Sequence, residues 1–163
     1  QLSLLEDKEI LGGKDELAGG TWLGFSKSGR FSALTNYKEN NSKEFKLSRG
    51  FLVTEFLDSN LSAKSYLESL NGKDYAGFNL IVGDKNGLFY FCNRSEGIYL
   101  LPEGIHALGN LSLNNNTDKI QSVKFDFEEL FLSKFKTQLA LDMMKKEYGK
   151  LHEKSKELSL IHI

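Results

Sequence analysis

The stretch FNLIVGDKNGLFYFC, residues 78–92, decides the fold because it holds two apolar runs on either side of a turn sequence. The runs, 78–82 and 88–92, flank the glycine-bounded segment GDKNG, which is typical of a β-hairpin. The first run is apolar at nearly every position, so both faces of its strand need cover. This pattern indicates layered sheets with helices outside them.

Two further hairpins are predicted around this one. Thr21–Ser26 and Phe31–Tyr37 are apolar runs joined by a turn in which Gly29 can adopt the positive φ of a tight hairpin. Ile98–Leu101 and Ile105–Leu108 form another pair, hinged at a Pro-Glu-Gly segment in which proline suits the first corner of a turn. Strand pairs joined by short turns predict a mainly antiparallel sheet.

Helical spacing of apolar residues separates these hairpins. One helix is predicted over Phe51–Leu57 behind a Ser48 cap, and a second from Ser62 to Leu70 with Ser62 as its N-cap. A third follows a Thr117 cap, with an apolar stripe made of Ile120, Val123, Phe127, Leu130 and Phe131. Strands and helices in separate runs predict the α+β class.

The two ends of the chain carry weaker patterns. Leu2–Ala18 is predicted to be loop, because Gly12-Gly13 interrupts any long helix. Residues 133–157 are rich in lysine and amphipathic at best, which favours a solvated helix over one that lies on a membrane surface. Residues 158–163 are what CTG TCT CTT ATA CAC ATC encodes, the end of a transposase-based sequencing adapter. We expect them not to belong to the protein; the alternative is a short apolar strand.

Composition narrows the class of protein. The chain has 163 residues, which fits one domain, and a net charge of −1, so it lacks the positive charge that binding to a nucleic acid needs. We find no apolar run long enough to span a bilayer and no charged-then-apolar leader. The single cysteine, Cys92, suits a reducing compartment, and the cytoplasm is the expected location.

Asparagines among apolar residues are the best candidates for a site. Asn36 and Asn93 end predicted strands, Asn79 lies inside one, and Asn110 follows Leu108-Gly109. A buried amide without partners costs about 1 to 3 kcal/mol, so each has either a structural partner or a ligand. At strand ends they are typical of neutral donors that stabilise an oxyanion or orient an amide.

Other chemistries find little support in the sequence. His106 is the one histidine on a predicted strand, and Cys92 has no neighbouring base or positive charge, so a structural role is favoured for both. No metal site, phosphate-binding loop or Gly-x-Ser-x-Gly elbow is predicted.

Several blocks in register resemble the NRDE family, also called the transport and Golgi organisation protein two family. The blocks are Leu11–Asp15, Leu17–Gly24, Ala33–Tyr37, Ser48–Gly50, Gly77–Ile81 and Asn93-Arg94. They cover roughly residues 11–132, so we expect a partial family domain over 1–132 and a divergent segment beyond it.

The resemblance implies an N-terminal-nucleophile hydrolase-like fold, an αββα sandwich, incomplete here at both ends. In that family the chain begins Met-Cys and carries an Asn-Arg-Asp-Glu motif, neither of which is in this sequence. The implied activity is that of an N-terminal-cysteine amidohydrolase acting on linear carbon–nitrogen amide bonds, without its nucleophile in this chain, which is therefore predicted to be inactive.

The resemblance also implies which residues serve the site. Asn36, Asn79 and Asn93 are the candidates for holding an oxyanion or orienting a substrate. The candidates for binding are Gly20, Thr21, Trp22, Thr35, Tyr37 and Asn110. A small-molecule substrate or ligand is expected, with no cofactor, and the oligomeric state is left open.

A non-catalytic alternative stays open beside hydrolysis. Eukaryotic relatives are associated with Golgi organisation and secretion, and with trafficking of haem or handling of acyl-CoA and lipid. Aromatic side chains could line a cleft for such an apolar ligand, namely Trp22, Phe25, Tyr37, Phe78 and Tyr90. Cys92, His106 and the methionines are the only haem ligands on offer. An interaction module built on the lysine-rich tail is the weakest hypothesis.

Overall fold

The computed structural model describes residues 2–4, 9–13, 15, 19–40, 45, 47–132 and 161–162. Two compact units divide the chain, residues 1–102 and residues 103–163, and each unit is described by itself. The predicted helix over 133–157 lies outside the described residues.

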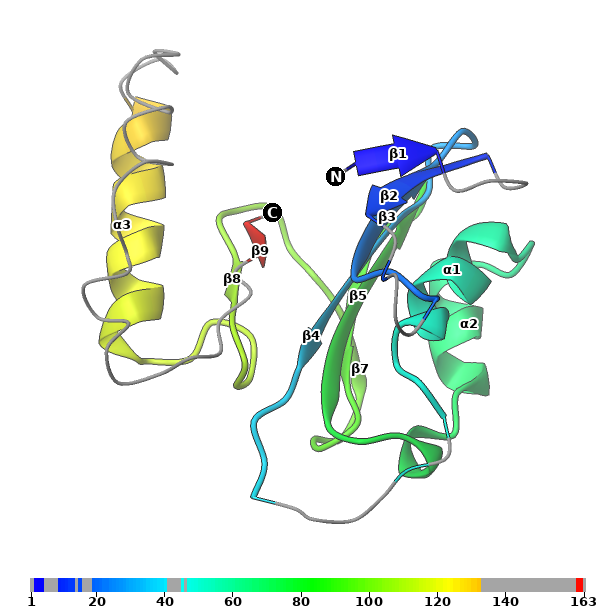
Figure 1. Ribbon diagram of the computed structural model, residues 1–163. Coiled ribbons are helices and arrows are strands. Elements are labelled where there is room, and N and C mark those ends of the chain that lie inside the picture. The colour runs from blue at the N-terminus through cyan, green and yellow to red at the C-terminus, as the bar shows by residue number, and fades with distance from the viewer. Residues whose placement is uncertain are drawn as a thin grey trace. The chain divides into compact units, whose positions relative to one another are not determined.

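Among the described residues, seven strands of the first unit form one antiparallel sheet in the order of the sequence (Figure 1). They are β1 (Leu2–Leu4), β2 (Ile10–Gly13), β3 (Leu23–Ser26), β4 (Phe31–Asn36), β5 (Phe78–Asp84), β6 (Gly87–Cys92) and β7 (Ile98–Leu100). The hairpins predicted at 21–37 and 78–92 are confirmed as β3–β4 and β5–β6. Gly29 has the positive φ of +80° that its turn requires.

Two helices inserted between β4 and β5 cover one face of this sheet (Figure 1). The first, α1 (Phe51–Asp58), packs on β2, β3 and β4, while α2 (Ala63–Ser69) packs on β5, β6 and β7. A short 3-10 helix, η1 (Gly72–Asp74), follows α2 and leads the chain back to β5. Helices and an antiparallel sheet together confirm the α+β class.

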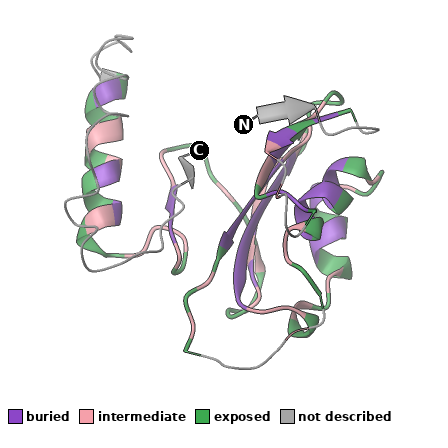
Figure 2. Ribbon diagram, in the orientation of Figure 1, coloured by how far each residue is buried: buried purple, intermediate pink, exposed green. Residues whose placement is uncertain are grey.

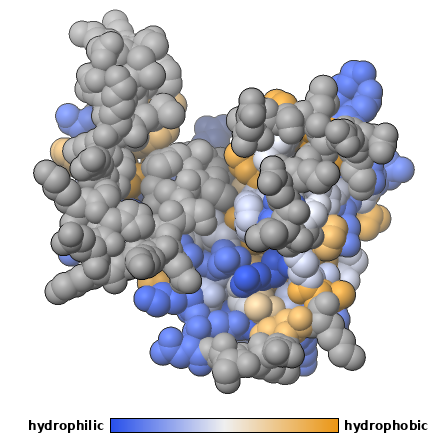
Figure 3. Space-filling model, viewed as in Figure 1, coloured by the Kyte–Doolittle hydropathy of each residue, from blue (hydrophilic) through white to orange (hydrophobic). Residues whose placement is uncertain are grey.

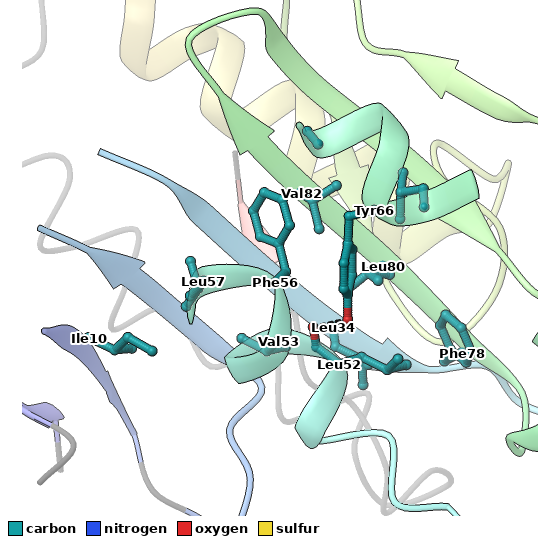
Figure 4. Packing of buried hydrophobic residues seen from close by; sticks show 12 residues of the cluster. Ile10, Leu34, Leu52, Val53, Phe56, Leu57, Tyr66, Phe78, Leu80 and Val82 are labelled. Atoms are coloured by element: carbon teal, nitrogen blue, oxygen red, sulfur yellow. Dashed lines mark hydrogen bonds between the residues drawn. The ribbon is translucent and has the colours of Figure 1, made fainter. Parts of the chain in front are cut away.

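The core lies between the sheet and these helices. Phe78, Leu80 and Val82 alternate along β5 and are fully buried beside Phe56 of α1 and Tyr66 of α2 (Figure 4). The rings of Phe56 and Tyr66 are 5.2 Å apart, and the Tyr66 hydroxyl donates to the Leu52 carbonyl oxygen at 2.8 Å. Burial raises the pKa of Tyr66 well above its ordinary value, so this donor stays protonated.

Burial of β4 and β5 extends to the other face of the sheet, as their sequences require. Ala33 and Ile81 face away from the helices and have no exposed surface, like Leu34 and Leu80 on the helix side. Figure 2 shows both strands in the colour of buried residues along most of their length. These two strands are therefore the most deeply buried part of the first unit.

Helix capping was predicted correctly for α2 but not for α1. Ser62 precedes α2 and its hydroxyl accepts the N–H of Ser65 at 3.1 Å. The prediction of a Ser48 cap is wrong, because α1 begins at Phe51 after Gly50 and no side chain caps it. Gly50 is instead held by main-chain packing, since its carbonyl oxygen accepts the N–H of Thr21 at 3.2 Å.

The prediction that Leu2–Ala18 is loop is also wrong, because this segment contains β1 and β2. Ile10 is buried under α1, and β2 pairs with β3 through Gly12 opposite Gly24. A Cβ on Gly12 would lie 2.8 Å from the Leu23 carbonyl oxygen. β2 and β3 therefore approach each other so closely that residue 12 must be glycine. The sequence pattern alone indicates the end of regular structure at this glycine.

The second unit contains α3 (Asp118–Leu132) and a small sheet made of β8 (Ala107–Leu108) and β9 (Ile161–His162). The prediction that β8 forms a hairpin with β7 is wrong, because, among the described residues, β8 pairs with β9 and β7 is the edge strand of the seven-stranded sheet. Proline lacks the N–H that a strand ladder uses, so Pro102 ends β7 rather than turning it back. The pairing of β9 with β8 is what the alternative interpretation, a short C-terminal strand, predicts. The adapter origin of residues 158–163 stays a prediction.

The predicted start of α3 is confirmed, and its predicted stripe is confirmed in part, since Phe127 is only half-buried. Thr117 precedes the helix and its carbonyl oxygen accepts the N–H of Gln121 at 3.0 Å. Ile120, Val123 and Leu130 are buried, but Phe131 is 63% exposed. Phe131 directly follows Leu130, and one residue turns a helix by about 100°, which carries its side chain off the stripe. None of the helices in the described residues has the length and apolar character that crossing a bilayer needs.

The close approach of the main chain at Gly20 to the main chain at Gly50, which we call the chain crossing, can be tested with the variants Gly20→Ala and Gly13→Ala. A Cβ on Gly20 would lie 2.5 Å from the Gly50 carbonyl carbon, whereas a Cβ on Gly13 would meet nothing within 4 Å. We expect Gly20→Ala to lower the free energy of unfolding by about 1–3 kcal/mol, because main chain must move away from main chain. Gly13→Ala should change it by less than about 0.5 kcal/mol. Urea unfolding followed by Trp22 fluorescence measures both, and equal stabilities would contradict the crossing.

Candidate functional site

A buried polar cluster crosses the centre of the sheet on the face opposite α1 and α2. It consists of Thr35 of β4, Asn79 of β5 and Tyr90 of β6, and we call it the Asn79 cluster. The Asn79 Nδ2 donates to Thr35 Oγ1 at 3.2 Å, and the Tyr90 hydroxyl donates to Asn79 Oδ1 at 2.8 Å. Thr35 and Asn79 have no exposed surface and Tyr90 is 5% exposed, so the amide is held inside the protein.

Strand register explains why these residues meet. Thr35 lies directly opposite Asn79, and Tyr90 lies opposite Ile81, one diagonal step from Asn79 on the same face. Because Tyr90 donates to Asn79 Oδ1, the NH2 group of the amide is the end that points toward β4. The cluster therefore fixes the orientation of the amide, which is what an oxyanion donor needs.

Cys92 lies opposite Asn79 in register but does not take part in a reactive arrangement. It is 1% exposed at the end of β6, and its sulfur accepts the N–H of Arg94 at 3.4 Å. Its burial is that of a structural cysteine, as the sequence indicated.

The start of β5 is held by a second group of side chains, which we call the Gly77 clamp. Glu39 Oε1 accepts the Gly77 N–H at 2.7 Å, while the Gly77 carbonyl oxygen accepts from Arg49 Nη1 at 2.9 Å and from the Tyr37 N–H at 2.9 Å. Arg94 completes the clamp through Nε to Glu39 Oε2 at 2.6 Å and Nη2 to Glu39 Oε1 at 3.1 Å. Both main-chain polar groups of Gly77 are thus fixed, two residues before Asn79.

Charge in the Gly77 clamp is reflected in its pKa values. Hydrogen bonds from Arg94 hold the pKa of Glu39 below its ordinary value, with further help from the Gly77 N–H and from Arg49. Burial lowers the pKa of Arg49, an effect that Glu39 opposes. Glu39 is therefore an anion at neutral pH and Arg49 remains a cation. Hydrophilic residues gather where the chain leaves β4 in the space-filling view (Figure 3).

Asn93 lies at the same end of the sheet but is used by the main chain. Its Oδ1 accepts the Phe78 N–H at 2.7 Å, and its Nδ2 donates to the carbonyl oxygens of Gly72, Tyr75 and Ala76 at 2.8 to 3.3 Å. These bonds close the loop between η1 and β5. The amide of Asn93 therefore has the structural role that the sequence left open beside a ligand.

The remaining sequence candidates divide into three groups. Gly20 and Thr21 are buried beneath Gly50, and the Thr21 hydroxyl donates to the Leu23 carbonyl oxygen at 3.0 Å. Trp22 and Asn36 are exposed. Asn110 belongs to the second unit, where its Oδ1 is buried and has no hydrogen-bond partner among the described residues. In the part of the chain that the structure describes, Tyr37 is itself part of the Gly77 clamp, Asn93 bonds to the next residue, and Thr35 and Asn79 lie two residues further along the paired strands.

A separate polar groove of about 350 Å³ lies at the opposite end of the sheet, where the β3–β4 and β5–β6 turns meet the link between the helices. Arg30 lines it, and Arg30 Nη2 donates to the carbonyl oxygens of Phe56 and Leu61 and to Ser59 Oγ. Its guanidinium also stacks on Phe56 at 4.1 Å. Arg30 therefore fastens the helices to the sheet. No candidate from the sequence lies among the residues that line this groove.

Comparison with known proteins identifies the family of this chain. A model of the family described as Transport and Golgi organisation 2 matches residues 1–159. The chain belongs to this family. It is similar to the Transport and Golgi organization 2 homolog of Mus musculus, with 39% identity, and to the Transport and Golgi organization protein 2 homologs of Homo sapiens, with 39%, and Bos taurus, with 37%. Each match extends over 126 residues and covers 70% of this chain and 45% of the relative, so the chain spans less than half the length of these relatives.

Most members of the Gly77 clamp come from the sequence blocks that resemble the Transport and Golgi organisation 2 family. Tyr37, Arg49, Gly77 and Arg94 all come from blocks that carry the resemblance, and Gly20 packs against Gly50 just beside Arg49. Sequence reasoning missed Glu39, which lies outside those blocks and 55 positions from Arg94. A lone acidic residue in a polar loop gives no signal for such a pairing.

The depressed pKa of Glu39 predicts a pH-dependent stability. A carboxyl group with a lower pKa in the folded state stabilises the protein above its unfolded pKa, and the effect is lost as the pH falls through the folded pKa. Between about pH 4.5 and pH 3 the unfolding free energy of the wild type should fall more steeply than that of Glu39→Gln. Urea unfolding across this range measures the difference.

The matched control for this measurement is Glu9→Gln. Glu9 pairs with Lys27 at 2.7 Å, but their side chains are 73% and 76% exposed, so the pair contributes little. Its pH profile should follow the wild type. Parallel profiles for wild type and Glu39→Gln would contradict the role of Glu39 in the clamp.

Proposed function

We propose that the full-length protein is an amide hydrolase in which Asn79 stabilises the oxyanion of the reacting amide. The observation that carries this proposal is the fixed orientation of the Asn79 amide by Tyr90 and Thr35. Donors held in place before the reaction stabilise developing charge without reorganising, and this accounts for much of the catalysis by such sites. Family membership and an antiparallel α+β fold agree with the N-terminal-nucleophile architecture that the sequence resemblance implies.

The proposed chemistry needs a nucleophile that this sequence does not contain. By the resemblance, it is a cysteine that follows the initiator methionine, with its own α-amino group as base. The thiolate attacks the amide carbonyl carbon, and the oxyanion that forms accepts hydrogen bonds from neutral donors such as Asn79. The α-ammonium group then protonates the leaving amine, and water hydrolyses the thioester. Cys92 has no part in this proposal, because it is buried in β6.

The decisive experiment uses the full-length protein with its native N-terminus. Incubation with a panel of N-acyl amines and N-acyl amino acids, followed by mass spectrometry, should detect release of the amine. Asn79→Ala should lower kcat by about 10²- to 10³-fold, the usual cost of one lost oxyanion donor. Asn60→Ala, on the exposed link between α1 and α2, should leave kcat unchanged.

A thiol probe separates loss of chemistry from loss of fold. An iodoacetamide probe should label the N-terminal cysteine in wild type and in Asn79→Ala alike, because the nucleophile does not depend on the oxyanion donor. Absence of both labelling and turnover in the wild type would overturn the hydrolase proposal. Loss of labelling only in Asn79→Ala would mean that the substitution disrupts the site itself.

A second candidate function is the binding of an acyl chain without reaction. It is favoured by apolar side chains on the surface of β2 and β3, since Leu11 lies opposite Phe25 in register and each is 46% exposed. The rings of Phe25 and Phe31 are 5.0 Å apart and extend this surface to β4. Haem is less favoured, because Cys92 is buried and His106 Nδ1 is 3.0 Å from Asn114 Nδ2. Saturable binding of a fluorescent fatty acid that Phe25→Ser weakens would support this candidate, and absence of saturation would exclude it.

A further inference from the structure

The charged side chains of the Gly77 clamp do not balance one another. Its charged members are Arg49, Arg94 and Glu39, which sum to one net positive charge at neutral pH. Glu39 is engaged on both oxygens by Arg94, through Nε at 2.6 Å and Nη2 at 3.1 Å. Arg94 is therefore neutralised by a two-point pair, and the charge of Arg49 is left over.

Arg49 uses little of its capacity as a donor. Among the described residues its guanidinium donates once, from Nη1 to the Gly77 carbonyl oxygen at 2.9 Å. Arg49 is half-buried, and none of its nitrogens is among the buried side-chain atoms that lack a partner in the described residues. Arg30 is a useful contrast, since a single one of its nitrogens donates to three acceptors. At this end of the sheet, Arg49 is the arginine that can donate to a further acceptor.

We propose that Arg49 binds a carboxylate of the substrate, so that the preferred substrates are N-acyl amino acids or similar amides with a nearby negative charge. This inference rests on the proposed function, because it assigns a substrate class to the same end of the sheet. A planar fork of N–H donors matches the two oxygens of a carboxylate. The single excess charge of the clamp matches a monoanion rather than a phosphate dianion.

Position along β5 sets the expected size of the ligand. Arg49 bonds to Gly77, which precedes Asn79 by two residues, or about 7 Å along a strand. By the proposed function the reacting amide lies at this end of β5, so a carboxylate bound at Arg49 belongs to the same short molecule. In an N-acyl amino acid the amide carbonyl and the carboxylate are separated by a nitrogen and one carbon.

The test titrates small ligands into the isotope-labelled chain at low salt and follows amide NMR signals, including those of Gly77 to Asn79. The probes are N-acetylglycine, its neutral amide N-acetylglycinamide, acetate and inorganic phosphate. Wild type should bind N-acetylglycine about tenfold more tightly than N-acetylglycinamide, because a charge-assisted pair is lost in the neutral probe. In Arg49→Gln this ratio should fall to near one, although the glutamine amide can still donate to Gly77.

Two further variants separate the role of Arg49 from general charge. Arg49→Lys keeps the charge without the fork and should retain part of the preference. Lys38→Gln removes one positive charge from the exposed residue next to Glu39 and should leave the preference intact. An equal loss in Lys38→Gln and Arg49→Gln would overturn the proposal, because the attraction would then be nonspecific.

The outcomes distinguish failure of this inference from failure of the proposed function. Equal affinities for N-acetylglycine and N-acetylglycinamide would overturn the carboxylate site while leaving amide recognition at Asn79 in place. Equal affinities for N-acetylglycine and acetate, both dependent on Arg49, would support the carboxylate site and count against amide recognition. Phosphate binding as tightly as N-acetylglycine would overturn the assignment to a carboxylate.

Discussion

Burial of β5 on both faces is the constraint on which the rest of the structure depends. A strand that meets no water must satisfy every polar group within the protein. Its main chain does so through β4 and β6, and its one polar side chain in the buried run, Asn79, does so through Thr35 and Tyr90. The same requirement fixes the peptide at Gly77, where β5 begins and where side chains replace the strand ladder.

The sequence predicted those parts of the fold that local chemistry determines. The two central hairpins follow from apolar runs and glycine turns, and the Ser62 cap follows from the preference of a hydroxyl for a free helix N–H. The errors concern places where a distant segment decides. Ser48 does not cap α1 because Gly50 is pressed against Gly20, and Gly12 lies in a strand because Gly24 approaches it. Neither contact can be detected from a short window of sequence.

The candidate site was predictable to a similar degree. Asn79 could be singled out as a polar residue inside an apolar run, and the structure supplies its two partners. Asn93 gave the same signal, yet its amide is used by four main-chain groups. The difference lies in tertiary geometry, since the alternation of a strand turns Asn79 into the sheet interior while Asn93 follows the end of β6. Glu39 gave no signal, because its partners come from three separate segments.

Strand order has a consequence for how this sheet assembles. Every pairing in it joins neighbours along the chain, and every link between paired strands except that between β4 and β5 is shorter than ten residues. Pairing of β4 with β5 alone must bring together the ends of a long excursion, residues 37–77, which makes it the contact with the largest loop-closure entropy. Bonds from Tyr37 and Glu39 to Gly77 join the first and last residues of that excursion. The Gly77 clamp therefore holds together the two ends of the longest link in this sheet, the one whose closure costs the most conformational entropy.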